Sequence, residues 1–105
     1  MKRGDIWLVN DGVALSEDVR AERLCLIVSP DVLLERLDTV LAVPVLRGGR
    51  PVSFRPVITI KEIDGVLVCD QLQALSKSHF VRRQGAADRK TLAAALAVLR
   101  ELFAD

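Results

Sequence analysis

Several residue types that carry chemistry are scarce or absent in this chain, and each absence narrows the set of functions. The 105 residues include no Tyr, one Trp and one His, so few aromatic faces can stack on nucleobases and few imidazoles can bind metal or move protons. The sequence also lacks a glycine-rich phosphate loop, a metal-ligand spacing and a nucleophile elbow. We therefore expect no cofactor and no bound metal.

The chain has no large excess of charge of either sign. A net charge of +1 does not suit a protein that coats nucleic acid by charge alone. The charges are nevertheless uneven, because acidic residues gather in the first forty positions and basic residues in the rest. The basic residues of the middle and late segments are Arg47, Arg50, Arg55, Lys77, Arg82, Arg83, Arg89 and Lys90. We expect a local cationic face that can meet phosphate.

Long apolar runs are missing too, which predicts neither a signal peptide nor a membrane span and favours a cytoplasmic protein. Cys25 and Cys69 each lie within a short apolar run, a pattern that favours two buried thiols over a disulfide or a metal pair. The length predicts one domain over residues 1–105. Its core must be mostly aliphatic, and the expected bulky fillers are Trp7, Phe54, Phe80 and Phe103.

Short apolar segments bounded by turn residues predict a mostly β structure. Alternation over 5–10 predicts a first strand, and the continuous apolar run over 23–29 predicts a strand that is buried on both faces. A loop is expected over 12–22 between them. Further strands are expected over 38–46, 52–60, 66–71 and 80–84.

Glycine and proline punctuate these strands. Gly48-Gly49 and Asp64-Gly65 predict turns, and Gly85 is expected to end the last strand. Because proline cannot donate to a ladder, Pro44 predicts an edge, a bulge or a strand end, and Pro56 predicts a local interruption.

Two helices complete the expected fold. Ser29-Pro30-Asp31 pairs an N-cap side chain with proline at the first helical position, which predicts one or two helical turns. Asp88 is placed to cap a longer terminal helix, whose apolar residues keep a period of 3.6 up to Phe103. Neither strands nor helix can bury an apolar face alone. We therefore expect an α+β fold, a small, twisted and partly closed antiparallel β-barrel with a short helix and a long C-terminal helix.

A series of landmarks follows one another in a fixed order along the whole chain. They are Arg3-Gly4-Asp5 with Trp7, a strand from Arg23 that ends in Ser29-Pro30, Val43-Pro44-Val45, Gly48-Gly49, Cys69-Asp70-Gln71 and a helix from Thr91 to Phe103. In this order the sequence resembles the MazF/PemK/Kid toxins of type II toxin-antitoxin systems, and the Kid and PemK branch in particular. The resemblance implies an SH3-like barrel of the CcdB/MazF type.

The resemblance also implies partners and an activity. Toxins of this kind are expected to form homodimers that cleave single-stranded RNA or mRNA without a metal ion, and so inhibit growth. They are held inactive by a cognate antitoxin with an acidic disordered tail. A base must take the proton of a ribose 2'-hydroxyl, a cation must hold the charge on phosphorus, and an acid must protonate the leaving oxygen.

Some residues agree with the family pattern. Arg23 matches the Arg of an Arg-Pro pair, although Leu24 replaces the proline, and the resemblance makes it the phosphate or transition-state binder. Asp70 matches an acidic residue implicated in acid or base work. Gln71 follows it as a group that contacts a base of the RNA. From the residues alone, the reading for Arg23 is an ion-pair partner of Glu22 or Glu17. Asp70 is as readily a turn former as a catalytic carboxylate.

Other residues depart from the pattern. Leu46 stands where the family has Thr or Ser, Val68 stands in place of an Arg, and Glu17 in place of a His. Losing one stabilising donor typically costs about a hundredfold to a thousandfold in rate. Arg47 can replace the missing cation, and His79 and Glu17 can serve as acid and base. Arg50 and Arg55 flank the same turn as Arg47 and are candidate RNA-binding groups. The alternatives are that His79 lies in a solvated loop and that the three arginines form a solvated loop.

Two functions are therefore compatible with the sequence. The first is a metal-independent endoribonuclease toxin. The alternative is a catalytically degenerate relative that acts by binding a protein, either its antitoxin or a target such as gyrase, and the apolar Leu46 and Val68 favour that alternative.

Overall fold

The computed structural model describes residues 1–14, 16–17 and 19–105, so two positions of the predicted loop over 12–22 lie outside the described part. Within it the strands are β1 (Asp5–Asn10), β2 (Glu22–Ile27), β3 (Thr39–Arg47), β4 (Val57–Ile60), β5 (Ile63–Leu67), β6 (Gln73–Ser76) and β7 (Phe80–Ala86). The α-helices are α1 (Asp31–Arg36) and α2 (Arg89–Leu102), and the 3-10 turns are η1 (Cys69–Gln71) and η2 (Lys77–His79). No helix of the described residues is long and apolar enough to cross a membrane.

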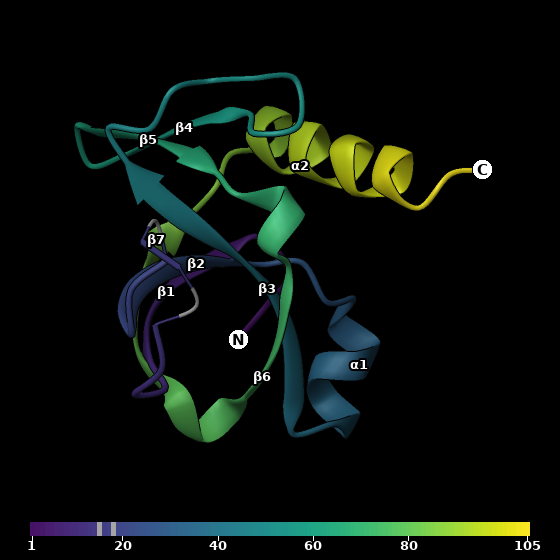
Figure 1. Ribbon diagram of the computed structural model, residues 1–105. Coiled ribbons are helices and arrows are strands. Elements are labelled where there is room, and N and C mark those ends of the chain that lie inside the picture. The colour runs from purple at the N-terminus through teal and green to yellow at the C-terminus, as the bar shows by residue number, and fades with distance from the viewer. Residues whose placement is uncertain (15, 18) are drawn as a thin grey trace.

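The strands form one curled antiparallel sheet in the order β4-β5-β3-β2-β1-β7, with β6 also paired to β3 (Figure 1). The long strand β3 joins the two halves of this sheet. Its first part, Thr39 to Ala42, pairs with β6, and its last part, Val45 to Arg47, pairs with β5. α2 lies across one end of the molecule beside β4 and β5, and α1 lies beside β3. The predicted α+β fold, a partly closed barrel with a long C-terminal helix, is confirmed.

The apolar core has two parts, one on each face of the sheet. On one face Ile6 and Leu26 pack with Ala95 of α2, and on the other Cys25 and Ile27 pack inside the curl. β2 is therefore buried on both faces, as its continuous apolar run predicted. Cys25 and Cys69 are free buried thiols, which confirms that prediction, and burial raises the pKa of Cys25 to about 12 and of Cys69 to about 11.

The long C-terminal helix forms where its cap and its period predicted. The Asp88 carboxylate accepts a hydrogen bond from the Thr91 backbone N–H at 2.7 Å. The helix packs closely on the start of β1, because a Cβ on Gly4 would lie 3.3 Å from a methyl carbon of Leu92. Gly4 also has a φ of +94°, so glycine is favoured there for two reasons.

The connections around β4 and β5 differ from the predicted ones. The strand expected over 52–60 begins only at Val57, because residues 52–55 close a turn in which the Arg55 N–H donates to the Val52 carbonyl at 3.0 Å. The turn expected at Asp64-Gly65 is wrong. The chain turns at Lys61 and Glu62, whose φ angles are +47° and +68°.

The segment after this turn also differs. Asp64 and Gly65 lie inside β5, and the strand expected over 66–71 ends at Leu67 and gives way to η1. Strand β6 was not predicted from the sequence, and β7 continues through Gly85 to Ala86. Cross-strand pairing explains the shift, because Ile60 pairs with Ile63 and Thr59 with Asp64.

Two of the four aromatic fillers do not fill the core. Trp7 and Phe80 pack edge to face, with ring centroids 6.2 Å apart. Phe54 and Phe103, however, are 44% and 76% exposed, so their prediction as core residues is wrong. Phe54 lies in the turn before β4 and Phe103 lies just beyond the last turn of α2, both outside the core clusters.

Candidate functional site

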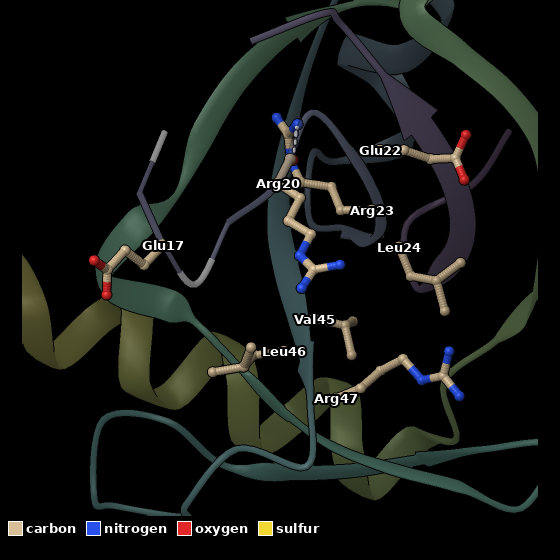
Figure 2. A pocket seen from close by; sticks show the side chains of 8 residues that line it. All are labelled: Glu17, Arg20, Glu22, Arg23, Leu24, Val45, Leu46 and Arg47. Carbon is tan, nitrogen blue, oxygen red and sulfur yellow. Dashed lines mark hydrogen bonds between the residues drawn. The ribbon is translucent and has the colours of Figure 1, made fainter. Parts of the chain in front are cut away.

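A pocket of about 430 Å³ opens between the β1–β2 connection and the end of β3. Its lining residues are Glu17, Arg20, Glu22, Arg23, Leu24, Val45, Leu46 and Arg47 (Figure 2). The structure therefore brings together three of the predicted catalytic residues: Glu17, Arg23 and Arg47. It adds Arg20, which the sequence reasoning missed.

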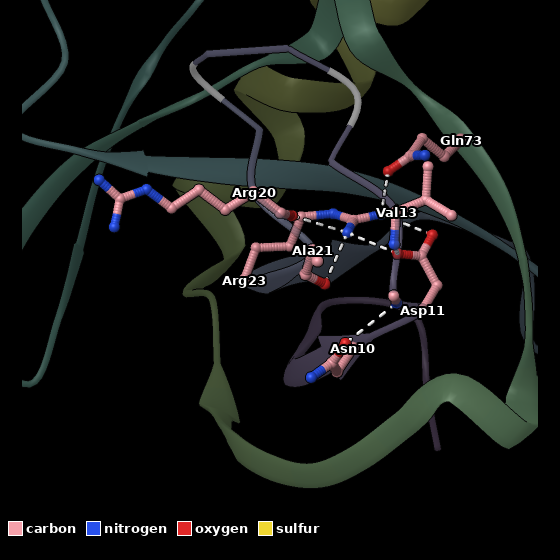
Figure 3. Close-up of polar contacts among 8 residues, drawn as sticks. Asn10, Asp11, Val13, Arg20, Ala21, Arg23 and Gln73 are labelled. Atoms are coloured by element: carbon pink, nitrogen blue, oxygen red, sulfur yellow. Dashed lines mark hydrogen bonds and ion pairs between the residues drawn. The ribbon is translucent and has the colours of Figure 1, made fainter.

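Arg23 lines this pocket but points its guanidinium away from it, into a polar network under the β1–β2 connection (Figure 3). Its two terminal nitrogens donate to the two carboxylate oxygens of Asp11 at 3.2 and 3.3 Å. One of them also donates to Gln73 Oε1 at 2.6 Å, and the other to the carbonyls of Arg20 and Ala21 at 2.9 and 3.0 Å. The Arg23 side chain is only 3% exposed.

This network makes Arg23 a fixed structural cation. The Arg23 guanidinium holds the pKa of the Asp11 carboxyl below its usual value, chiefly through their hydrogen bond. The ion pair expected with Glu22 or Glu17 is formed instead with Asp11. Direct phosphate binding by Arg23 stays a prediction, but the guanidinium would have to release Asp11 to reach a ligand. The geometry favours a positioning role, because the same nitrogen that pairs with Asp11 holds the backbone at Arg20.

Arg20 and Arg47 are the cations that open into the pocket. Both side chains are exposed, and Figure 2 shows the Arg20 guanidinium reaching down toward Val45 and Arg47. The sequence carried one signal for Arg20, since it lies three residues before Arg23 in a loop that is otherwise acidic. That signal could not reveal which of the two guanidiniums turns inward and which turns to the pocket.

The other pocket residues show what the family departures mean in space. Leu46 is half-buried in the pocket wall, whereas Val68 is fully buried in the core. Glu17 is exposed at the rim, and its carboxylate points away from the Arg20 guanidinium. The hydroxyl of its neighbour Ser16 donates to Gln71 Oε1 at 3.3 Å, which ties this rim to η1.

Asp70 is absent from the residues that line the pocket. Both of its carboxylate oxygens accept hydrogen bonds from Arg55, from Nε at 2.9 Å and from Nη2 at 3.0 Å. The Arg55 side chain is 21% exposed and that of Asp70 32%. The hydrogen bond from Arg55 is the main cause that keeps the pKa of the Asp70 carboxyl below its usual value. Asp70 and Arg23 thus serve two separate ion pairs and do not meet in one pocket.

The remaining predicted site residues lie apart from the pocket. His79 lies in η2, at the end of β3 where Ser76 pairs with Thr39, whereas the pocket lies at the opposite end around Arg47. Arg50 is exposed in the β3–β4 connection. The described residues contain no cluster of three or more His, Cys, Asp or Glu side chains that could hold a metal ion.

Comparison with known proteins identifies the family. A family model described as PemK-like, MazF-like toxin of type II toxin-antitoxin system matches residues 2–103. Among solved structures, MazF from Deinococcus radiodurans covers 97% of this chain and 94% of its own, with a TM-score of 0.83 and 19% identity. An endoribonuclease from a mycobacterial species, in complex with its cognate antitoxin, covers 96% of this chain and 92% of its own. Its TM-score is 0.81 and its sequence identity is 18%.

A third solved structure, the Mycobacterium tuberculosis toxin MazF-mt6, covers 94% of this chain and 95% of its own, with a TM-score of 0.77 and 17% identity. At such identities these structures show the fold, and the match over nearly the whole sequence shows the family. The family that the ordered landmarks predicted is therefore confirmed. The chain belongs to the PemK-like, MazF-like toxins of type II toxin-antitoxin systems.

Proposed function

We propose that this toxin is a metal-independent endoribonuclease that cleaves single-stranded RNA in the cytoplasm, as a single domain spanning residues 1–105. The observation that carries the proposal is the pair of exposed guanidiniums, Arg20 and Arg47, at one concave site. A solved structure of the same fold is described as an endoribonuclease, which agrees with it.

The chemistry requires charge stabilisation at phosphorus. The ribose 2'-hydroxyl attacks the adjacent phosphorus, and the bond from phosphorus to the 5'-oxygen breaks, leaving a 2',3'-cyclic phosphate and a 5'-hydroxyl. Arg20 and Arg47 donate to the non-bridging oxygens, where negative charge grows in the transition state. Planar guanidiniums suit this task because they stay charged and present paired donors.

Proton transfer falls to the rim of the pocket. Glu17 is the carboxylate that we assign as the base, and a side-chain rotation brings its exposed carboxylate toward the bound 2'-hydroxyl, whose proton it takes. Solvent water in the open pocket protonates the leaving 5'-oxygen. Arg23 contributes indirectly, since its hydrogen bonds to the carbonyls of Arg20 and Ala21 hold the segment that carries the Arg20 cation.

The decisive experiment is cleavage of single-stranded RNA by the purified protein in EDTA, with products resolved on a gel. We expect internal cuts with cyclic phosphate ends. Arg20→Ala and Arg47→Ala should each lower the rate about a hundredfold to a thousandfold, and Glu17→Gln should slow it as well. Arg36→Ala and Glu35→Gln, on the exposed face of α1, are matched controls that keep the wild-type rate. Uncut RNA at high protein concentration would refute the enzyme and favour a toxin that acts by binding protein.

The partners follow from the same surface. We propose that the toxin forms a homodimer and that a cognate antitoxin with an acidic disordered tail covers Arg20 and Arg47, so that its carboxylates compete with RNA phosphate. MazE-MazF and endoribonuclease-antitoxin complexes are known for proteins of this fold. Co-expression with the product of the neighbouring open reading frame should give a complex whose formation Arg20→Ala and Arg47→Ala weaken, as measured by calorimetry.

A further inference from the structure

The Arg55–Asp70 ion pair joins two segments that are 15 residues apart in sequence. Arg55 uses Nε and Nη2 as a fork on the two carboxylate oxygens, at 2.9 and 3.0 Å, which is the strong bidentate geometry for these groups. The Arg55 guanidinium carbon also lies 5.9 Å from the centroid of the Phe54 ring. The pair is only partly exposed, so water screens it less than an ordinary surface ion pair.

The segment that this pair anchors leads directly from the pocket. β3 ends at Arg47, one of the two cations of the pocket, and the connection over 48–56 carries the chain to Arg55 and β4. Residues 50–54 in the middle of this connection are all exposed. A fixed Arg55 therefore limits how far this connection can move, whereas the backbone of Arg47 is held by its pairing with Gly65 of β5.

Residues 70–73 hold the other wall of the pocket as well. Gln71 accepts a hydrogen bond from the Ser16 hydroxyl at 3.3 Å, and Gln73 accepts one from Arg23 at 2.6 Å. Asp70 thus holds the β3–β4 connection, while Gln71 and Gln73 hold the β1–β2 connection. The two connections that flank the pocket are therefore both tied to this short segment.

The chemistry of the pair does not suit proton transfer by Asp70. A general acid or base is efficient when its pKa lies near the working pH. Arg55 keeps the pKa of Asp70 low and occupies both oxygens, which leaves a weak base and no proton to give. Asp70 is also absent from the lining of the pocket.

We propose that Asp70 is a positioning residue, which through Arg55 fixes the β3–β4 connection next to the Arg47 cation and takes no proton during cleavage. The proposal rests on the proposed nuclease function for its kinetic consequences. Its structural part is that Asp70 anchors the β3–β4 connection at Arg55. That part rests on the geometry of the ion pair and does not require nuclease activity.

Charge exchange separates positioning from proton transfer. Asp70→Ala and Arg55→Ala should each lower the cleavage rate about tenfold to a hundredfold through misplacement, and the double variant should be no worse than either single one. Asp70→Asn keeps a carbonyl oxygen that can accept a hydrogen bond from Arg55, so its cleavage rate should fall less than that of Asp70→Ala. The exchanged variant, Arg55→Asp with Asp70→Arg, should recover most of the rate although position 70 has no carboxylate. Asp38→Ala, whose exposed carboxylate accepts from Ser76 at the far end of β3, is the matched control.

Hydrogen exchange gives a readout that needs no activity. Amides over 49–55 should exchange faster in Asp70→Ala than in the wild type, return toward wild-type rates in the exchanged variant, and stay unchanged in Asp38→Ala. Thermal melting of every variant identifies any that are unfolded. If the wild type leaves RNA uncut, the nuclease proposal fails while the exchange data still decide the anchoring.

Two results would overturn the proposal. One is unaltered exchange over 49–55 in folded Asp70→Ala. The other is a loss of cleavage in Asp70→Asn and in the exchanged variant that is as complete as in Asp70→Ala, together with an acidic limb of the pH profile that moves to higher pH in Arg55→Ala. That pattern marks a carboxylate that must itself take a proton, because removal of Arg55 raises the pKa of Asp70.

Discussion

Arg23 and Asp11 form a two-pronged ion pair beneath the candidate pocket, with their terminal nitrogens and oxygens 3.2 and 3.3 Å apart. Their side chains are 3% and 12% exposed. The pair ties Asp11, just after β1, to Arg23 in β2, and the same guanidinium reaches Gln73 at the start of β6. A residue that the family resemblance marks for chemistry is thus bound to other groups of the protein beneath the pocket.

Removal of Asp11 should destabilise the fold strongly. Asp11→Ala leaves the buried Arg23 charge without its carboxylate, which typically costs about 3–5 kcal/mol in the free energy of unfolding. Urea denaturation measures this. The comparison is Asp64→Ala, because the exposed Asp64 carboxylate accepts a hydrogen bond from the Thr59 hydroxyl at 3.0 Å, and the loss of this bond should cost less than about 1.5 kcal/mol. An equal loss of unfolding free energy in the two variants would mean that the Arg23–Asp11 pair contributes no more than an exposed hydrogen bond.

The contribution of Asp11 should depend on pH in one direction. Arg23 keeps the pKa of Asp11 lower in the folded than in the unfolded chain, so its stabilisation is complete above the unfolded pKa and is lost as the pH falls through the folded pKa. The difference in unfolding free energy between wild type and Asp11→Asn should be widest near neutral pH and narrow on acidification. Urea titrations from pH 7 to pH 3 test this, and a difference that widens toward acid would contradict it.

Gly65→Ala should damage both stability and the site. A Cβ at position 65 would lie 2.9 Å from the carbonyl oxygen of Leu46, so β5 and the end of β3 would have to separate. Overpacking of this kind costs about 1–3 kcal/mol. Because Leu46 precedes Arg47, RNA cleavage should fall along with the melting temperature. Gly12→Ala is a useful comparison, since among the described residues beyond its chain neighbours no heavy atom lies within 4 Å of its Cβ position. Its positive φ of +76° adds strain but no clash with those residues.

The salt dependence of RNA binding should distinguish Arg20 and Arg47, which contact RNA, from Arg36, which does not. Each phosphate contact on a single strand adds about 0.7 to the slope of log K against log salt concentration. Arg20→Ala and Arg47→Ala should each reduce the slope by roughly that amount, whereas Arg36→Ala should not. Fluorescence anisotropy with single-stranded DNA, which lacks the 2'-hydroxyl, measures binding without cleavage. A slope that stays at the wild-type value in both variants would remove Arg20 and Arg47 from the RNA-binding surface.

His79→Gln should leave the cleavage rate and its pH profile unchanged. His79 lies beside Phe80 at the end of β3 that pairs with β6, and the pocket lies at the end that pairs with β5. No rearrangement of one side chain spans that strand. Single-turnover rates across the neutral pH range check this, and a missing alkaline or acidic limb in the variant would return His79 to the list of proton-transfer groups.

The elements that the sequence predicted well are those that local patterns determine. Asp88 and the spacing of Leu92, Leu96 and Leu99 are enough to define α2, and the apolar run of β2 is enough to define a strand buried on both faces. The turn after β4 was misplaced because Asp64-Gly65 is a common turn pair. Here Gly65 is needed inside β5, where β3 approaches too closely for a side chain.

The site was harder to predict because it depends on side-chain directions and distant pairs. Arg23 was identified from its strand position, yet its partner Asp11 lies across a connection whose path no local pattern determines. Arg20 and Arg23 look alike in the sequence, and only the fold turns one outward and the other inward. Arg55 was identified as an RNA-binding residue, but its pairing with Asp70 follows from the turn at Val52 to Arg55.

Pro44 explains how one strand can serve both halves of the sheet. β3 leaves β6 after Ala42 and joins β5 from Val45 onward, and between them the Pro44 carbonyl accepts a hydrogen bond from the Val68 N–H at 2.9 Å. The ring nitrogen faces the same edge and has no hydrogen to donate, so neither β6 nor β5 can extend its hydrogen-bonded ladder past Pro44. The proline therefore fixes the register of β3, because a slip by one residue would place its ring opposite a carbonyl that requires a donor. The same slip would carry Arg47 out of the pocket.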